Sequence, residues 1–376
     1  MRPARLHARH HSRGPTWRLV VVFALLAAMA AIATEILPGP AKASDSSTCA
    51  APPGTFSIAI CGNQFVNQAG QTVVLRGVNT EGTQYDCAQA GAGFYDDPTV
   101  SPGDYTTEID AMKAWGINVV RVNLNEQCWL AGTQETSVDD IIPATTYQTG
   151  YPIPPGDTYD TSVNAYMNEM GDYVAALNAN GIYAELDLHL NAPNGQVITD
   201  ASGDYQNPLP ESYSDLFWKS VAAYFSDNHA VLFGVFNEPF PPNAAADGDT
   251  ATGWGCDLNG CTVPDYTNTS DYSTVPSTTY AGEGMQQMID DIRQYNTTAP
   301  LLVGGPDWAG DTDQWLATFF PGGVSIDPSD ELAASVHIYF PSGNSPCADT
   351  DDVTTDCGGY IPQIAAVTPV VLDEVG

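Results

Sequence analysis

The chain has 376 residues, of which 43% are hydrophobic, and this is enough apolar material for a large folded core, which excludes a disordered chain. Asp and Glu number 45 against 11 Lys and Arg, so the formal net charge is -34. Because phosphate repels so acidic a surface, we expect no nucleic acid and no membrane surface as partners, whereas a neutral substrate is compatible with this charge.

Residues 1–43 predict an export signal. A basic stretch is followed by an apolar run from Leu19 to Ala33, and Ala41-Lys42-Ala43 forms a cleavage site of the small-x-small type. The apolar run has about 15 residues, which is shorter than the roughly 20 residues that a membrane-spanning helix needs. We therefore expect removal of residues 1–43 and a secreted, extracellular domain over residues 44–376. An uncleaved membrane anchor is the alternative.

Eight cysteines follow this signal, and an even number in an exported chain indicates disulfides rather than metal thiolates. The histidines beyond the signal lie too far apart in sequence for a structural zinc site, and we expect no cofactor and no metal. Proximity in sequence favours four local disulfides: Cys49 with Cys61, Cys87 with Cys128, Cys256 with Cys261, and Cys347 with Cys357.

A hairpin is predicted over residues 56–66, and beyond it strand-like runs alternate with helical segments to the end of the chain. This order is typical of repeated βα units around a parallel sheet. Seven runs predict strands, over residues 73–79, 117–124, 182–191, 231–237, 301–305, 332–340 and 370–376. Helices are predicted over residues 105–115, 162–179, 213–225, 282–295 and 312–319.

These elements indicate the α/β class and a (β/α)8 TIM barrel with its last strand missing. Because the sequence stops at Gly376, at the end of a strand, we expect a barrel truncated after the seventh strand. A doubly wound open sheet is the rival architecture, but the first strand is not followed by its Gly-x-Gly-x-x-Gly turn.

Two long segments, residues 127–160 and 240–279, follow the second and fourth predicted strands. Both leave the carboxyl ends of strands, where barrel enzymes build their active sites. Trp254 and Tyr266 in the second segment could stack on sugar rings or form the core of their own loop, and the sequence leaves both interpretations open.

Polar residues gather at the carboxyl ends of the predicted strands. In the run over 182–191, Glu185, Asp187 and His189 share one face with odd numbering, and we expect this face to point into the barrel. Arg121 could form a structural ion pair with Asp187 or Glu185, or it could serve an active site, and the two roles are compatible.

Two carboxylates stand apart, because each ends an apolar strand: Glu238 in the fourth and Glu374 in the seventh. A glycosidase needs two carboxyl groups on either side of the bond that it cleaves, one protonated to donate to the leaving oxygen and one ionised to attack the anomeric carbon. Opposed positions in the mouth of a barrel supply this geometry.

The chain here resembles the retaining glycoside hydrolases of family 5, which are cellulase-like barrel enzymes. The resemblance covers nearly the whole mature chain in six ordered motifs: Leu75-Arg76-Gly77-Val78-Asn79, Val120-Arg121, Asp187-Leu188-His189, Asn237-Glu238-Pro239, His337-Ile338-Tyr339 and Glu374. It implies that Glu238 is the general acid/base and Glu374 the nucleophile. It also implies roles in substrate binding for five further residues, with Asn237 contacting the sugar 2-hydroxyl, Arg121 and Tyr339 bonding the nucleophile, and His189 and His337 lining the cleft.

The family resemblance implies a secreted, retaining glycosidase that acts on a neutral β-linked polysaccharide or oligosaccharide. Endo-β-1,4-glucanase (cellulase) activity in glucan catabolism is the favoured function, and we expect a monomer. A β-mannanase or a β-1,3-glucanase of the same family is an alternative, as is a catalytically dead sugar-binding barrel. The presence of both Glu238 and Glu374 argues against the last. The family's eighth strand supplies a Trp below the cleavage site, and this sequence ends before it.

Overall fold

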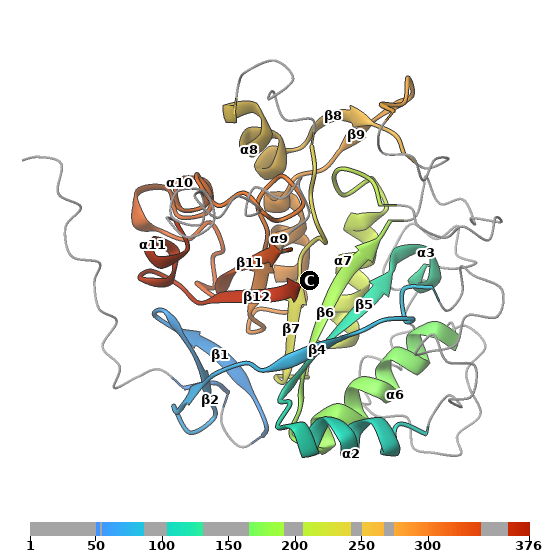
Figure 1. Cartoon of the computed structure of the whole chain (residues 1–376), viewed down its shortest axis with the longest axis vertical. Coiled ribbons are helices and arrows are strands. Elements are labelled where there is room, and N and C mark those ends of the chain that lie inside the picture. The colour runs from blue at the N-terminus through green and yellow to red at the C-terminus, as the bar shows by residue number, and fades with distance from the viewer. Residues whose placement is uncertain are drawn as a thin grey trace, which may run out of the picture. The chain divides into compact units, whose positions relative to one another are not determined.

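The computed structural model describes residues 50–52, 55–85, 104–130, 165–191, 206–241, 250–266, 274–339 and 360–376. Its centre is a parallel sheet of seven strands in the order β12-β11-β10-β7-β6-β5-β4, nearly closed into a barrel (Figure 1). The strands are β4 (Gly77–Thr80), β5 (Val119–Asn125), β6 (Tyr183–Leu190), β7 (Val231–Gly234), β10 (Leu301–Val303), β11 (Leu332–Ile338) and β12 (Val370–Val375). All seven predicted strands are confirmed, and the first is shorter than expected because residues 72–73 pair outside the barrel sheet.

Helices cover the outside of this sheet, and their apolar residues pack against the outward-facing strand residues Val120, Val122 and Leu124. The five predicted helices correspond to α2, α6, α7, α9 and α10. The helices are α2 (Thr106–Trp115), α3 (Glu126–Trp129), α6 (Ala165–Ala179), α7 (Ser214–Tyr224), α8 (Thr250–Asn259), α9 (Met285–Arg293), α10 (Trp315–Phe319) and α11 (Ile361–Ala365), with a short 3₁₀ turn η2 (Pro321–Gly323). Within the described ranges, none has the length and apolarity that crossing a membrane requires.

The base of the barrel is apolar. The predicted hairpin is confirmed as β1 (Ile58–Cys61) and β2 (Gln64–Asn67), to which β3 (Thr72–Val73) adds a third antiparallel strand. Ile58 and Phe65 of this hairpin pack against residues from the strand starts, such as Val119 and Leu302. The interior is therefore closed with hydrocarbon at the base, and the polar residues lie nearer the carboxyl ends of the strands.

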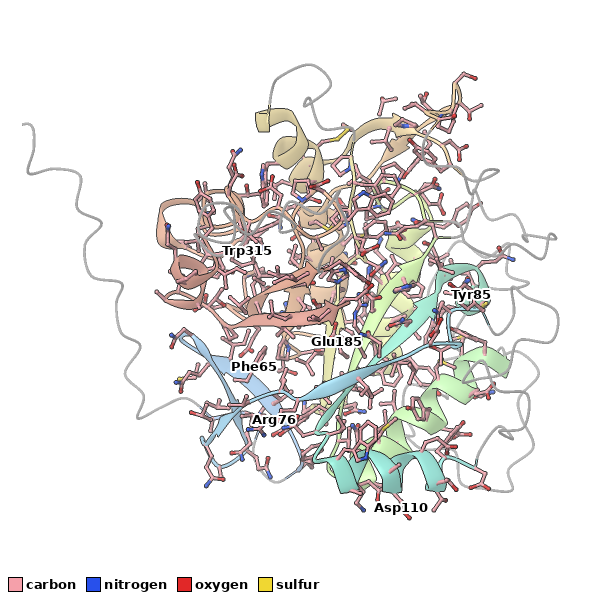
Figure 2. All side chains as sticks on the ribbon, viewed as in Figure 1. Phe65, Arg76, Tyr85, Asp110, Glu185 and Trp315 are labelled. Atoms are coloured by element: carbon pink, nitrogen blue, oxygen red, sulfur yellow. A yellow bond between two sulfur atoms is a disulfide. The ribbon has the colours of Figure 1, made fainter. Side chains whose placement is uncertain are left out.

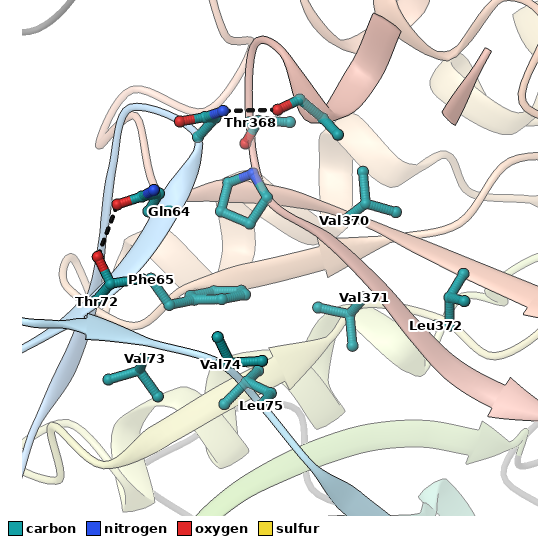
Figure 3. A pocket seen from close by; sticks show the side chains of 13 residues that line it. Gln64, Phe65, Thr72, Val73, Val74, Leu75, Thr368, Val370, Val371 and Leu372 are labelled. Atoms are coloured by element: carbon teal, nitrogen blue, oxygen red, sulfur yellow. Dashed lines mark hydrogen bonds between the residues drawn. The ribbon is translucent and has the colours of Figure 1, made fainter. Parts of the chain in front are cut away.

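The two edge strands of the sheet, β4 and β12, approach each other at the carboxyl end. There the Asn79 side-chain amide donates to the backbone oxygen of Asp373 at 2.9 Å. Toward the base the edges enclose a cavity of about 530 Å³ (Figure 3). Its lining includes Phe65, Val74, Leu75, Val371 and Leu372. The two edge strands are thus joined at the mouth of the barrel and separated by this cavity nearer the base.

A bulge interrupts the pairing of β11 with β12. Ser335 of β11 lies opposite Val371 of β12, and His337 of β11 lies opposite Glu374 of β12. Between these two pairs β11 advances by two residues and β12 by three, so β12 carries the extra residue. Strict alternation would send Asp373 and Glu374 to opposite faces of the strand. Because a bulge re-aims the side chains next to it, both carboxylates approach His337.

Where the structure describes the second long segment and the residues that follow it, they form α8 and a hairpin of β8 (Cys261–Pro264) and β9 (Thr279–Gly282), which the sequence analysis missed. The disulfide between Cys256 and Cys261 is confirmed. Trp254 is only 2% exposed and packs edge-on against Phe319, so its role as loop core is the correct interpretation.

Other predictions fall on residues outside the described ranges. Residues 1–43, most of the segment over 127–160, and residues 162–164 are among them. Cys61 and Cys128 are disulfide-bonded. The four remaining cysteines of the predicted pairs, Cys49, Cys87, Cys347 and Cys357, also lie outside the described residues.

Candidate active site

Arg121 organises the polar layer at the carboxyl ends of the strands. It is 4% exposed, and its guanidinium donates hydrogen bonds to Glu185 (3.2 Å), Asn79 (3.3 Å), Glu374 (3.0 Å) and Asn237 (2.8 Å). It also forms an ion pair with Asp187 at 3.0 Å. Burial alone would lower the pKa of the guanidinium, but the surrounding carboxylates raise it, so Arg121 stays charged. The sequence left open two roles for Arg121, in an interior ion pair and in the site. Arg121 has both contacts at once, because it pairs with Glu185 and Asp187 and also bonds Glu374.

The inward face of β6 is confirmed as polar. Glu185 and Asp187 are buried, and both pair with Arg121. Asp187 also lies 2.9 Å from His189 Nδ1, which fixes that ring at the edge of the site. Burial favours the neutral form of Asp187, but Arg121 and His189 outweigh it and lower the Asp187 pKa. Figure 2 shows Glu185 among the strands of the sheet, in contrast to Asp110 on the outer helix α2.

Glu374 is held by three groups. Its Oε2 accepts from Arg121, its Oε1 accepts from the Tyr339 hydroxyl, and His337 Nδ1 lies 3.6 Å from Oε2. Burial would raise the pKa of Glu374, yet His337, Tyr339 and Arg121 together lower it. The carboxylate is therefore ionised at neutral pH, which is the state that a nucleophile requires.

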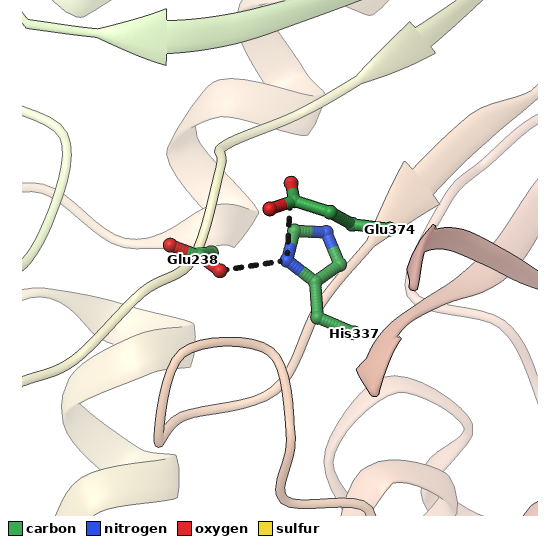
Figure 4. Close-up of side chains that lie close together, drawn as sticks. All are labelled: Glu238, His337 and Glu374. Atoms are coloured by element: carbon green, nitrogen blue, oxygen red, sulfur yellow. Dashed lines mark hydrogen bonds and ion pairs between the residues drawn. The ribbon is translucent and has the colours of Figure 1, made fainter. Parts of the chain in front are cut away.

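Glu238 and Glu374 both lie close to one ring nitrogen of His337. His337 Nδ1 lies 3.0 Å from Glu238 Oε1 and 3.6 Å from Glu374 Oε2, so the same nitrogen faces both carboxylates (Figure 4). Carboxylate oxygens of Glu238 and Glu374 approach within 4.8 Å of each other. The structure thus brings together two carboxyl groups from strand ends 136 positions apart in sequence, as the paired-carboxylate hypothesis requires.

The backbone at Glu238 is strained. Its φ of 47° is left-handed, a conformation that is costly for a residue with a Cβ atom and that often marks functional sites. Gln206 stabilises this turn, because its side-chain amide donates to the backbone oxygens of Asn237 (2.7 Å) and Glu238 (3.0 Å). Sequence reasoning missed Gln206, which lies in a loop without a motif.

A second left-handed segment follows β10 and borders the same site. Asp307, Trp308 and Ala309 have φ values of 58°, 62° and 59°. The Trp308 N–H donates to the backbone oxygen of Pro239, and the Ala309 oxygen accepts from the His337 N–H. The turn therefore connects the Glu238 segment to β11 through backbone hydrogen bonds. No pattern in the sequence predicted it.

Every site residue predicted from the sequence lies in the described part of the chain, and all of them meet in one polar cluster: Arg121, His189, Asn237, Glu238, His337, Tyr339 and Glu374. The structure adds Asn79, Glu185, Asp187, Gln206 and Asp373. The Asn79 motif was noted in the sequence, but its role in bonding Arg121 was not.

Among the described residues, Glu238, His337 and Glu374 are the group whose ligand atoms approach closely enough to hold a metal ion. The His337 Nδ1 atom is engaged with Glu238, however, and a metal would need its lone pair. We assign the 3.0 Å contact between these two atoms to a shared proton.

Comparison with known proteins gives a consistent picture. A family model described as cellulase (glycosyl hydrolase family 5) matches residues 66–376. Over 199 residues the chain is 27% identical to Endoglucanase 1 of Robillarda sp. (strain Y-20), a match that covers 48% of this chain and 42% of that protein. The chain therefore spans less than half of this curated relative.

Two solved structures are also similar. An endocellulase from Pyrococcus horikoshii, crystallised with cellotetraose, has a TM-score of 0.50 at 15% identity, covering 85% of this chain and 81% of its own. A β-glucanase from Saccharophagus degradans has a TM-score of 0.49 at 19% identity, covering 86% and 74%. At such low identity, the first likeness shows a shared fold.

Proposed function

Because this chain belongs to glycosyl hydrolase family 5, we propose that it hydrolyses β-1,4 linkages within a neutral β-glucan and retains the configuration at the anomeric carbon. The observation that carries the proposal is the approach of Glu238 and Glu374 to within 4.8 Å. Retaining glycosidases place their carboxyl groups about 5 to 5.5 Å apart, whereas inverting enzymes need roughly 6.5 to 9.5 Å to admit a water molecule.

In the proposed mechanism, Glu374 attacks the anomeric carbon and Glu238 delivers a proton to the leaving oxygen. The glycosidic bond breaks, and an ester forms between the sugar and Glu374. Glu238, now ionised, takes a proton from water, the water oxygen attacks the same carbon, and Glu374 is released as a carboxylate. The lowered pKa of Glu374 supports its role as nucleophile.

The remaining residues hold the reacting groups in place. Arg121 and Tyr339 bond Glu374 and keep it ionised and oriented. We assign His189 and His337 to the walls of the cleft, and Asn237, whose oxygen is fixed by Arg121, to the contact with the sugar 2-hydroxyl. The similarity to a protein named endoglucanase supports an internal cleavage site in a glucan. We further propose export by the signal over residues 1–43 and action as a monomer.

The test is release of reducing sugar from carboxymethyl cellulose, mixed-linkage glucan, β-1,3-glucan and mannan. We expect release from the β-1,4-glucans, and loss of at least about 10³-fold in Glu374→Gln and Glu238→Gln. Glu108→Gln on the outer helix α2 is the matched control and should retain full activity. Release from mannan or β-1,3-glucan alone would reassign the substrate, and no release by folded protein would favour a sugar-binding barrel.

Azide distinguishes the two carboxylates. With an activated aryl β-cellobioside, azide should restore the activity of the Glu374→Gly variant and yield the α-glycosyl azide, because azide replaces the missing nucleophile directly. With Glu238→Ala it should yield the β-glycosyl azide, because azide then attacks the glycosyl-enzyme intermediate. The opposite pairing of products would exchange the two roles.

A further inference from the structure

Asp373 occupies an unusual position beside the proposed nucleophile. Its side chain is 2% exposed, and the bulge in β12 turns it toward the interior, next to Glu374. Its Oδ1 atom has no hydrogen-bond partner and lies 3.5 Å from His337 Nε2, an atom that is also buried without a partner. Two buried polar atoms of opposite character face each other here.

The other ring nitrogen of His337 faces the proposed acid/base. Its Nδ1 atom lies 3.0 Å from Glu238 Oε1, as the dashed line in Figure 4 marks. The group that binds one nitrogen of an imidazole decides which nitrogen carries the proton. A carboxylate at Nε2 keeps a proton there, and it leaves Nδ1 able to accept another proton from Glu238.

Resting on the function proposed above, we propose that Asp373 is a positioning residue: it holds a proton on His337 Nε2, so that Nδ1 shares with Glu238 the proton that is delivered to the leaving group. His337 and Glu238 then act as one proton-holding pair. The bulge is what allows one strand to supply both the carboxylate that attacks and the carboxylate that orients the histidine.

Other charged groups around His337 agree with this role. They come from several strands of the sheet: Arg121 on β5, Asp187 on β6, Glu238 after β7, and Asp373 and Glu374 on β12. Burial lowers the pKa of His337, but Glu238, Asp373 and Glu374 outweigh burial and Arg121 and raise it. The histidine therefore binds a second proton more readily than an ordinary imidazole.

Glu185 is a further carboxyl group close to Asp373. Its pKa is raised well above the usual value, first by burial and then by the Asp373 charge, whereas Arg121 lowers it. Its Oε1 atom accepts from Arg121 Nε at 3.2 Å, so Arg121 offsets part of the negative charge that gathers beside His337.

Asp373→Asn tests the proposal by kinetics. We expect the alkaline limb of the kcat/KM profile to move about one pH unit lower, because the shared proton is held less tightly. We also expect kcat to fall about 10-fold for an aryl β-cellobioside with a poor leaving group. For a dinitrophenyl β-cellobioside, whose leaving group departs without protonation, kcat should stay within about twofold of the wild-type value. Asp110→Asn on the outer face of α2 removes the same charge and should change neither.

A purely structural role for Asp373 would lower the rates of both substrates equally and leave the alkaline limb in place, and that result would overturn the proposal. A wild-type protein inactive on all substrates would instead overturn the proposed function. Should Asp373→Asn fail to fold, ¹⁵N NMR of His337 in the wild-type protein decides: a proton on Nε2 supports the proposal, and a neutral ring protonated only on Nδ1 contradicts it.

Discussion

Arg121 and Glu374 are joined by a hydrogen bond of 3.0 Å, although they belong to different strands and lie 253 residues apart in sequence. The same guanidinium also bonds Asn237, the neighbour of Glu238. A single buried cation thus fixes the relative positions of both proposed catalytic carboxylates. The geometry of the site depends on the planar shape of arginine as much as on its charge.

We therefore expect Arg121→Lys to reduce both stability and activity strongly. Lysine keeps the charge but has three donors instead of five, so buried acceptors lose their partners. The free energy of unfolding should fall by about 3 kcal/mol and kcat by at least about 100-fold, measured by urea unfolding and by hydrolysis under native conditions. Arg293→Lys is the matched control, because Arg293 is also buried and pairs with Asp327. It should lose stability but keep the kcat of the folded fraction, and an equal loss of kcat in both variants would contradict this role for Arg121.

Tyr339→Phe should shift the acid limb of the activity profile to higher pH. Glu374 works in its ionised form, so activity falls as the pH drops through its pKa, which the Tyr339 hydroxyl helps to lower. Without that donor the pKa rises, and the limb should move up by about one pH unit. Tyr295→Phe, at an exposed tyrosine, serves as control. An acid limb that stays in place would show that Tyr339 does not stabilise the ionised nucleophile.

Glu331→Gln should stabilise the protein at alkaline pH only. Glu331 Oε2 accepts from the Ile60 N–H at 2.6 Å, and burial raises the Glu331 pKa to about 8. The buried side chain therefore contributes its full stability at pH values below the ordinary pKa of glutamate. This contribution is lost as the pH rises through about 8, because the carboxyl group must then ionise. Glutamine keeps the acceptor without the charge, so Tm should be roughly 3 °C higher than wild type at pH 9 and unchanged at pH 4. The same difference at both pH values would rule out titration of Glu331 as the cause.

Gln206→Ala should reduce catalysis more than stability. The variant leaves the Asn237 and Glu238 backbone oxygens without their donor and releases the left-handed turn. Because small displacements of a catalytic group are costly, we expect kcat to fall roughly 10- to 100-fold with little change in KM. Gln206→Glu, which keeps the size but loses the donor, should behave alike, and Gln286→Ala on α9 should match wild type. Full kcat in Gln206→Glu would show that the amide donor is not what holds the turn.

The sequence predicted those parts of the fold and site that follow from periodicity. Alternation along residues 182–191 correctly put Glu185, Asp187 and His189 on the interior face, because the side-chain period of a strand is two. The seven strands and five helices were likewise predicted, with bounds that differ by a few residues. Their positions depend on local patterns that a sequence carries directly.

Other parts of the site could not be predicted, because they depend on departures from regular backbone. Alternation would place Asp373 opposite to Glu374, and only the bulge brings both carboxylates to His337. The left-handed residue at Glu238 and the turn at Trp308 are likewise set by tertiary contacts. Gln206 reaches its partners from a loop with no regular pattern. Such features are strained locally and stabilised by neighbours distant in sequence.

The hydrogen bond from Asn79 to the Asp373 backbone spans 294 residues and joins the first and last strands of the sheet. Contacts of such sequence separation form late, because a long stretch of chain must first be ordered. Helices and neighbouring strand pairs can assemble from nearby segments, but the polar cluster needs both ends of the sheet in place. Recovery of hydrolysis after dilution from denaturant therefore reports the final step of barrel assembly, and it should lag behind the recovery of helical circular dichroism.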